Sequence, residues 1–406
     1  MPGRAASARG IAWLLAAMSA IGPFAIDTYL PAFASIGHDL GGSPLAVQQT
    51  LTAYLATFAV MSLWHGALSD SLGRRRVALW SIAGFALSSL ACAAATTIEQ
   101  LWAGRALQGV CGGAGLVLGR AVARDLFEGA RAQRLLAQVT MIFAVAPAVA
   151  PLIGGQLHAA LGWRAIFVFL ALYAAALWLV CLRALPETLA VAARQPLRAA
   201  SLARGFGAVL RDRVFWCLAS AIAVNFAGFF LYVLAAPAFL GRHLGLSEQA
   251  YFWLFGPTVV GTIGGSWLAS RLAGRLDPAR TIAWGLGGML AAALLNLAIN
   301  LAAPASLPWA IVPIPLYTIG MALSSPSLTL LILDRFGERR GTAASCQSFL
   351  QSGLNTLTAG VIAPLAWGAT LHLAAAQAVL IALGIALALL GCRLARRGRA
   401  AAAASI

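Results

Sequence analysis

The sequence predicts an all-α polytopic membrane protein in which twelve transmembrane helices form two pseudo-symmetric six-helix halves. Three observations support this fold class. The 406 residues are 61% apolar and only 10% charged, with a mean hydropathy of +0.85, whereas a soluble domain has about 25% charged residues. Apolar runs of about 20 residues, the length that crosses a bilayer, recur along the whole chain. Arginines gather in alternate connections between these runs, as they do in polytopic membrane proteins.

Turn signals and charges divide the apolar runs into twelve predicted spans. The longest connection, over 184–213, is rich in arginine and is the only linker-like stretch. We therefore expect an N-terminal six-helix bundle over 1–183, a cytoplasmic linker loop over 184–213 and a C-terminal six-helix bundle over 214–406. The predicted spans are 11–33, 46–68, 77–96, 100–122, 134–157, 165–184, 214–238, 250–270, 281–300, 309–332, 342–364 and 373–392.

The distribution of arginine predicts the orientation of the chain. With the N-terminus in the cytoplasm, 24 arginines lie in the tails and connections on the cytoplasmic side, and only Arg164 and Arg242 lie on the outer side. Positively charged residues are enriched in cytoplasmic connections. We therefore expect a multi-pass protein of the bacterial inner membrane with both termini in the cytoplasm.

The composition also excludes several classes of function. All 28 basic residues are arginine, so the lysine of an ATP-binding P-loop is missing and the chain contains no ATP-driven pump. Although the formal net charge is +16, the arginines are scattered between apolar runs and form no nucleic-acid-binding face. The six cysteines lie within apolar runs and are expected to be small buried hydrophobic residues. We expect neither a metal site nor a cofactor.

Three short patterns recur in the two halves of the chain, about 200 residues apart, each at the corresponding span or loop. Such repeats favour two parallel six-helix halves with a substrate site near the membrane midplane. The paired patterns are Pro31-Ala32-Phe33 with Pro237-Ala238-Phe239, Gly73-Arg74 with Gly274-Arg275, and Ala150-Pro151-Leu152 with Ala363-Pro364-Leu365.

The loop after the second span carries the motif Gly66-Ala-Leu-Ser-Asp70-Ser-Leu-Gly73-Arg74. Gly73 permits a tight turn, which brings Asp70 close to a helix N-terminus or an arginine. The segment resembles the G-x-L-x-D-x-x-G-R-[RK] signature of the major facilitator superfamily. That resemblance implies the fold of the family and a charge relay with an acid at the inner end of the fourth span, where Asp125 lies. Asp70, Arg74 and Asp125 are therefore expected to form a cytoplasmic cluster that holds one conformation.

The fourth span contains Arg105-x-x-Gln108, which is similar to the R-x-x-Q-G element of the same family. A buried arginine is costly in lipid, so Arg105 is expected to face a cavity or an acid. If both side chains face the centre of the protein, Arg105 and Asp27 lie at similar depth and within reach of each other.

The fifth span contains Ala150-Pro151-Leu-Ile-Gly154-Gly155. This stretch resembles the antiporter motif G-P-x-x-G-G, with Ala150 in place of its first glycine. Proline and small residues allow a kink and close helix contact. Packing of small residues alone is the alternative interpretation.

Three further segments resemble the Bcr/CflA-type branch of the drug:proton antiporters, whose members export compounds such as bicyclomycin, chloramphenicol and sulfonamides. This resemblance lies almost entirely within residues 20–190. The segments are Asp27-Thr-Tyr29-Leu-Pro31, Arg120-Ala-Val-Ala-Arg124-Asp125 and Gly162-Trp163-Arg164-Ala-Ile-Phe167.

Asp27 is the only one of the twelve acidic residues that lies inside an apolar run. A carboxyl group within a membrane span marks a functional site, and proton relay is one of its known uses. We expect Asp27 and Arg105 to form the proton-coupling site, and a structural ion pair between them is the competing interpretation.

Polar and aromatic residues in several spans are candidates for the substrate cavity, although each is also compatible with plain packing. The candidates are Tyr29, Tyr54, Gln108, Asn225, Phe229, Tyr232, Gln347, Gln351 and Asn355.

Together these patterns predict a secondary active transporter that carries out proton-coupled multidrug efflux by alternating access. Proton-coupled uptake or export of a metabolite or sugar on the same fold is the alternative. An intramembrane enzyme needs a Ser/His, di-Asp or HExxH constellation at membrane depth, which is missing here, and the parallel halves favour alternating access over a channel. The expected partners are a small amphiphilic drug-like substrate, protons and the lipid bilayer, with no nucleic acid, and the chain is expected to act as a monomer.

Overall fold

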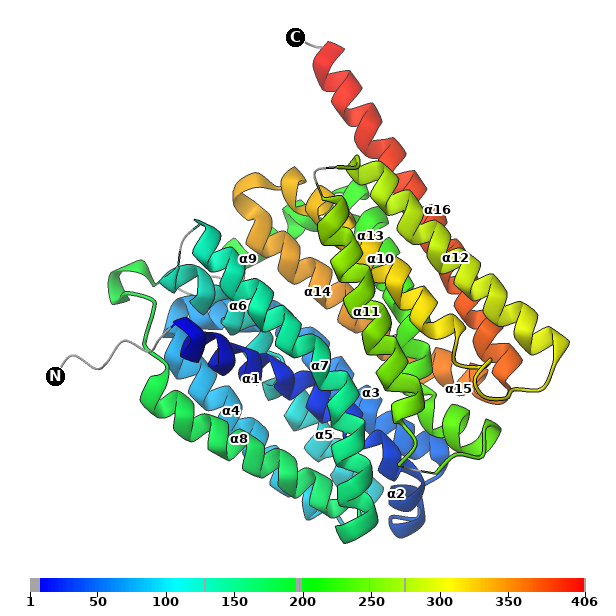
Figure 1. Ribbon diagram of the computed structural model, residues 1–406. Coiled ribbons are helices and arrows are strands. Elements are labelled where there is room, and N and C mark those ends of the chain that lie inside the picture. The colour runs from blue at the N-terminus through cyan, green and yellow to red at the C-terminus, as the bar shows by residue number, and fades with distance from the viewer. Residues whose placement is uncertain are drawn as a thin grey trace. The chain divides into compact units, whose positions relative to one another are not determined.

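The structure is a computed structural model that describes residues 8–127, 129–194, 197, 199–247, 249–273 and 275–404 (Figure 1). These residues form helices and the connections between them, and no β-strand occurs among them. The chain divides into two compact units, unit 1 over Met1–Leu197 and unit 2 over Arg198–Ile406. The predicted all-α fold class is confirmed.

Unit 1 contains helices at each of the first six predicted spans. The first span is divided into α1, a short 3-10 turn η1 and α2, and the fourth span is divided into α5 and α6 at Gly113. The elements of unit 1 are α1 (Ala8–Asp27), η1 (Leu30–Ala32), α2 (Phe33–Asp39), α3 (Pro44–Leu72), α4 (Arg74–Ala93), α5 (Ile98–Gly112), α6 (Ala114–Leu126), α7 (Gly129–Leu161), α8 (Arg164–Ala184) and η2 (Val191–Ala193).

Unit 2 contains helices at the other six predicted spans and one helix that the sequence analysis missed. Residues 184–213 were expected to form a loop, but α9 lies within them and packs against α14, where Gly205 meets Thr342. The elements of unit 2 are α9 (Ala199–Leu210), α10 (Arg213–Leu234), η3 (Pro237–His243), α11 (Phe252–Leu272), α12 (Pro278–Ala302), α13 (Pro313–Arg335), η4 (Gly337–Arg339), α14 (Arg340–Leu357), η5 (Thr358–Ile362), α15 (Ala363–Ala366) and α16 (Thr370–Ala404).

Nine helical segments among the described residues are long and apolar enough to cross a membrane. The other three predicted spans correspond to α7, α11 and the run from α14 to α15. Within α7, Val145–Leu161 is a shorter apolar stretch. Glycines dilute the apolar residues of α11, and α14 is rich in serine, threonine and glutamine. Polar residues in a span are expected to face protein or water instead of lipid, so these compositions remain compatible with membrane spans.

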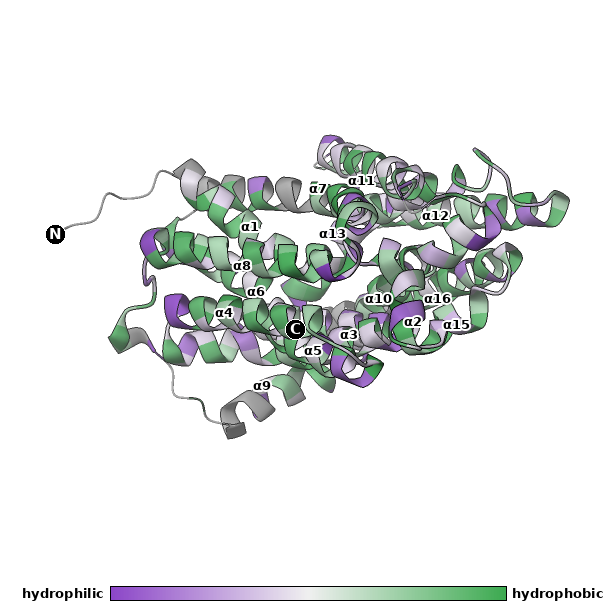
Figure 2. Cartoon of the chain, turned by 90° about the horizontal axis from the view of Figure 1, so that it is seen from below, coloured by the Kyte–Doolittle hydropathy of each residue, from purple (hydrophilic) through white to green (hydrophobic). Residues whose placement is uncertain are grey.

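Exposed tryptophans mark the ends of the spans. Hydrophobic residues, green in Figure 2, predominate along the helices. An exposed tryptophan ring near a helix end is therefore expected to lie at the membrane interface. Tryptophan is enriched at that depth because it is both apolar and able to donate a hydrogen bond. The exposed tryptophans are Trp13, Trp64, Trp80, Trp102, Trp216, Trp253, Trp267, Trp284 and Trp309.

Close packing between α4 and α5 depends on two cysteine and glycine pairs. The Sγ atom of Cys92 in α4 fills the space next to Gly104 in α5, and the Sγ atom of Cys111 in α5 fills the space next to Gly84 in α4. All six cysteines are free, and three of them are buried. The predicted role of the cysteines as small hydrophobic residues is therefore consistent with their positions, since glycine lets the two helices approach closely.

The first testable prediction concerns topology. A reporter fused after Arg397 should be active in the cytoplasm, and a reporter inserted at Leu244, between η3 and α11, should be active only on the outer side. The reason is that twelve crossings return the chain to the side on which it began, and arginine-rich ends stay inside. Alkaline phosphatase and green fluorescent protein fusions measure the two locations. An outer-side C-terminus would contradict the twelve-span arrangement.

Candidate functional site

The first span breaks immediately after Asp27. Pro31 has no backbone N–H, so it cannot bond to the carbonyl of Asp27 four residues earlier, and the regular helix ends there. The Phe24 carbonyl, in the last turn of α1, accepts from both the backbone N–H of Thr28 at 3.2 Å and the Thr28 hydroxyl at 2.5 Å. The sequence therefore places Asp27 at an interruption in a membrane helix, the kind of position at which transporters bind ions and substrates.

The carboxyl group of Asp27 is buried, with 4% of the residue exposed. Among the described residues it accepts no hydrogen bond and forms no ion pair. In a low-dielectric interior a carboxylate without a partner is costly, and such a group exchanges protons when its surroundings change.

Helix α7 packs directly on this break. A Cβ atom at Gly154 would overlap the backbone carbonyl of Thr28, so only glycine fits there. Pro151 and Gly155 are also buried, and α7 continues as one helix through Pro147 and Pro151. The antiporter-like motif on α7 therefore packs against the chain one residue after Asp27.

A second buried polar group in unit 1 is centred on Arg105, which is fully buried in α5. The guanidinium lies between the rings of Tyr29 and Tyr54, with its carbon 4.5 Å from each ring centre. One of its terminal nitrogens donates to Gln108 at 2.6 Å, and Gln108 donates in turn to Ser89 of α4 at 2.7 Å. We call these five residues the Arg105 cluster. Stacking on two rings stabilises the cation where water is excluded.

The ion pair between Asp27 and Arg105, which was the competing interpretation, is not formed among the described residues in this conformation. Within the described residues, two nitrogens of Arg105 and the Tyr54 hydroxyl have no hydrogen-bond partner. Tyr54 nevertheless lies close enough to interact electrostatically with both Arg105 and Asp27. Helical rise alone places the two residues at similar depth, but α1 ends at Asp27 and the two rings enclose the guanidinium.

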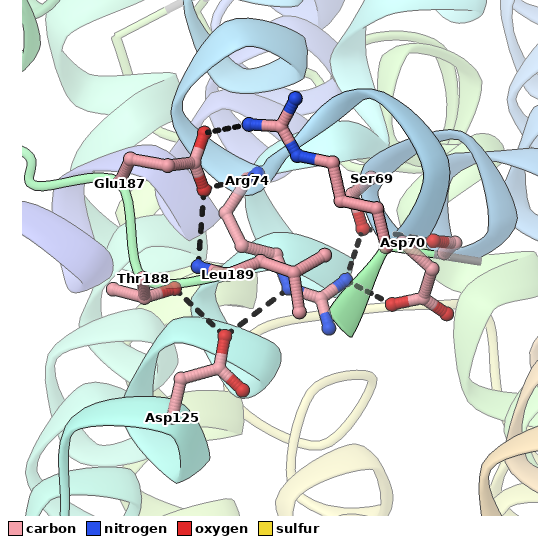
Figure 3. A network of polar contacts seen from close by, with 9 residues as sticks. Ser69, Asp70, Arg74, Asp125, Glu187, Thr188 and Leu189 are labelled. Atoms are coloured by element: carbon pink, nitrogen blue, oxygen red, sulfur yellow. Dashed lines mark hydrogen bonds and ion pairs between the residues drawn. The ribbon is translucent and has the colours of Figure 1, made fainter. Parts of the chain in front are cut away.

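The structure brings the cytoplasmic motif residues together around Arg74 (Figure 3). Arg74 forms an ion pair with Asp70 and a second one with Asp125 at 3.2 Å, and it donates to Ser69 at 2.6 Å. Gly73 adopts φ +101°, a conformation that favours glycine, and it ends α3. Gly66 lies four residues before Asp70 on α3, where its nearest neighbour is Val117 of α6.

Two linker residues that the sequence analysis did not single out complete this network (Figure 3). The Glu187 carboxylate accepts from the backbone N–H of Arg74 at 2.9 Å, which caps the start of α4. Thr188 donates to Asp125 at 2.7 Å. An acid within a connection between spans carries little signal of its own, so only the fold identifies Glu187 as a partner of Arg74.

In unit 2, two of the proposed cavity residues are interior. Tyr232 is 1% exposed and accepts from Asn296 at 2.6 Å, and Asn296 also donates to Gln377 at 2.8 Å. The backbone carbonyl of Asn225 accepts from Tyr317 at 2.9 Å, while its side chain lies against Gly384 of α16. This network joins α10, α12, α13 and α16. Asn296 and Gln377, two amides inside apolar spans, were a signal that the sequence analysis overlooked.

The remaining proposed cavity residues are half-buried. Phe229 lies on α10, stacked edge-on against Phe226, and the other three lie on α14. Gln347 donates to Thr329 of α13 at 3.2 Å, and the side-chain oxygen of Asn355 has no partner among the described residues. Gln351 is half-buried. Gly274, a member of the repeated loop pattern, lies outside the described residues.

Known proteins resemble this chain over most of its length. A sequence model of the Major Facilitator Superfamily matches residues 13–359. The chain is 34% identical over 358 residues to "Uncharacterized MFS-type transporter YdgK" of Bacillus subtilis, covering 87% of this chain and 88% of the relative. It is 30% identical over 353 residues to "Multidrug resistance protein D" of Escherichia coli, covering 87% of each chain. It is 32% identical over 257 residues to "Bicyclomycin resistance protein homolog" of Haemophilus influenzae, covering 63% of this chain and 65% of the relative.

Solved structures share the fold. The human organic anion transporter MFSD10 superposes with a TM-score of 0.67 at 19% identity, covering 95% of this chain and 99% of that one. A bacterial homolog of the human lysosomal transporter Spinster, inward-facing and occupied, superposes with a TM-score of 0.70 at 16% identity, covering 95% of this chain and 96% of that one.

The second testable prediction concerns the contact between α7 and the break in α1. Gly154→Val should lower the free energy of unfolding by about 1–3 kcal/mol or more, because the added carbons overlap the Thr28 carbonyl. Thermal unfolding of the purified protein in detergent measures the change. Gly264→Val on α11 is the matched control, since open space surrounds that position. Equal effects of the two variants would show that α7 does not depend on glycine at this contact.

Proposed function

We propose that this chain, which belongs to the major facilitator superfamily, is a bacterial inner-membrane transporter that exports small amphiphilic drug-like molecules in exchange for protons. The proton gradient is its energy source, and it uses no cofactor. Relatives named for multidrug, bicyclomycin and chloramphenicol resistance support an exported drug as the substrate class. Both termini lie in the cytoplasm, as the arginine distribution predicts.

The observation that carries the proposal is the state of Asp27. Its carboxyl group is buried, has no partner among the described residues, and lies at a helix break against α7. Protonation removes the charge from a site where the charge has no counterion. A group in this position therefore gains a proton from one side of the membrane and loses it when the conformation changes.

The Arg105 cluster supplies the coupling partner. Tyr54 interacts with both Arg105 and Asp27, and Arg105 keeps two nitrogens without hydrogen-bond partners. A rearrangement that brings Asp27 toward those nitrogens favours the ionised carboxylate, and separation of the two favours proton uptake. Alternating access supplies such a change, since it moves helices of one bundle around a fixed site.

The Arg74 network is the conformational latch of this mechanism. Its ion pairs and hydrogen bonds join the ends of α3, α4 and α6 to the linker. Charge-assisted hydrogen bonds of this kind are stronger than neutral ones, so the network favours the conformation in which it is closed. Transport then requires that it open once in each cycle.

The third testable prediction addresses proton coupling. Asp27→Asn should insert normally but lower proton-driven drug export by about 100-fold, the scale on which a positioned proton-transfer group contributes. Inside-out membrane vesicles loaded with a pH-sensitive dye measure proton release when a drug is added. Asp277→Asn is the control, because Asp277 is an acid in a connection and not in a span. Vesicles in which Asp27→Asn still releases protons on drug addition would assign the coupling to another group.

The fourth testable prediction addresses the latch. Asp70→Asn should leave membrane insertion intact and lower the transport rate by about 10-fold, because it removes one ionic partner of Arg74 from a switching element. Drug efflux from intact cells measures the rate, and an epitope tag measures the amount in the membrane. Asp334→Asn serves as the control, since Asp334 forms an exposed ion pair with Arg340. Unchanged efflux would limit the motif to a role in topology.

A further inference from the structure

The Gly162-Trp163-Arg164 segment, which the proposed function does not use, binds the far end of the first span. The indole N–H of Trp163 donates to the Asp39 carboxylate at 2.9 Å, and Arg164 lies 3.7 Å from the same oxygen. Trp163 is 2% exposed. Gly162 adopts φ +81° between α7 and α8, a conformation that favours glycine and sets the turn that presents Trp163.

Two further contacts tie the same end of unit 1 together. The Ser35 hydroxyl on α2 bonds to the His158 ring on α7 at 2.8 Å. Arg164 donates to the Ala95 carbonyl, in the connection between α4 and α5, at 3.2 Å. We call Ser35, Asp39, His158, Trp163 and Arg164 the clasp. It fixes α2 to α7, to α8 and to the α4–α5 connection.

A continuous row of aromatic rings leads from the clasp to the Arg105 cluster. Trp163 meets Phe167 edge-on with ring centres 6.1 Å apart, and Phe167 lies 5.8 Å from Tyr29. Tyr29 in turn covers one face of the Arg105 guanidinium at 4.5 Å and bonds to Thr50 at 2.7 Å. Phe167 and Tyr29 are fully buried. A displacement of Trp163 is therefore passed on through close-packed rings, because buried side chains have no room to move independently.

We propose that the clasp is a positioning element for the proton-coupling site. It holds α2, and through Trp163 and Phe167 it sets the position of the Tyr29 ring over Arg105. Tyr29 is two residues after Asp27 in the sequence. The clasp residues touch neither the proton nor the substrate, so they are positioning residues. The assignment rests on the proposed function, since it concerns the geometry in which Asp27 and Arg105 work.

A clasp that served only stability would behave differently from a positioning element. Loss of a surface bond at a helix end lowers the unfolding temperature and leaves the transport rate of the folded protein unchanged. Loss of a positioning contact changes the rate of the folded protein and loosens the backbone around the site. The two cases are therefore separated by measuring turnover and local backbone opening in the same variants.

The test uses three variants of the full chain and one matched control. Asp39→Ala removes the acceptor, Trp163→Phe keeps a ring but removes the N–H, and Arg164→Gln removes the charge. Arg242→Gln is the control, because Arg242 is the other arginine predicted on the outer side and is exposed. Amide hydrogen exchange in detergent reports the opening of residues 28–36, and reconstituted vesicles report the maximal rate and KM of proton-driven export.

We expect each of the three variants to exchange about tenfold faster over residues 28–36 and to export about three- to tenfold more slowly, with KM changed by less than about twofold. The control should match the wild type in both measurements. Wild-type exchange over 28–36 in all three variants overturns the proposal, and so does faster exchange with an unchanged export rate. If one variant fails to fold, the other two decide the outcome by the same measurements.

The failure of the proposed function is recognised separately. Wild-type protein that exports no drug in response to a proton gradient refutes that function, whatever the clasp variants do. Hydrogen exchange over residues 28–36 still tests whether the clasp holds the break in α1, and unchanged exchange overturns the positioning role on its own.

Discussion

The Arg105 guanidinium is the group around which the interior of unit 1 is arranged. A charge placed in an apolar bundle is costly unless its surroundings compensate for it. Here the compensation comes from the two tyrosine rings and from Gln108, which Ser89 holds in turn. Gln108 lies on α5 with Arg105, whereas the other groups come from α3, α4 and the segment that follows the break in α1. Compensating for one cation therefore fixes the relative positions of these four elements.

The same constraint explains the small residues around the site. Helix α3 approaches α5 closely enough for Tyr54 to reach Arg105 because α5 has glycine at positions 109 and 112. A side chain at either position would overlap Tyr54. The Thr57 hydroxyl then reaches the Ala106 carbonyl at 2.7 Å. In lipid the hydrophobic effect does not drive helices together, so contacts of this kind carry much of the association between them. A side chain at Gly112 would meet the Tyr54 ring, and one at Gly109 would meet the Thr57 hydroxyl and the Tyr54 backbone carbonyl.

The sequence predicted the features of the chain that depend on local composition. The helical segments and the cytoplasmic motif follow from hydropathy, arginine distribution and turn residues, and the residues of that motif do lie together around Arg74. Asp27 was recognisable because an acid within an apolar run is rare. These signals are local, so one sequence is enough to detect them.

The features that the sequence did not predict depend on tertiary contacts. The two rings that enclose the Arg105 guanidinium were not predicted, because cation–π contacts leave no spacing pattern in a sequence. Glu187 joined the motif from a connection more than one hundred residues away, and α9 formed within the expected loop by packing on α14. Asn296 and Gln377 carried the same signal as Asp27, a polar side chain within an apolar run, and were recognisable on that ground.

The two ends of unit 1 use the same chemistry with different strength. At the motif end, Arg74 is nearly buried and has two carboxylate partners, so opening that end requires charges to separate where water is scarce. At the clasp, Asp39 and Arg164 are each about half exposed, and water replaces a broken bond at little cost. The neutral indole of Trp163 is the buried member of the clasp, so packing against Phe167, more than charge, is what resists its movement. A bundle built in this way has one end held mainly by electrostatics and the other mainly by ring packing. The break in α1 at Asp27 lies between those two ends, next to Tyr29 in the row of rings that ends at the Arg105 cluster.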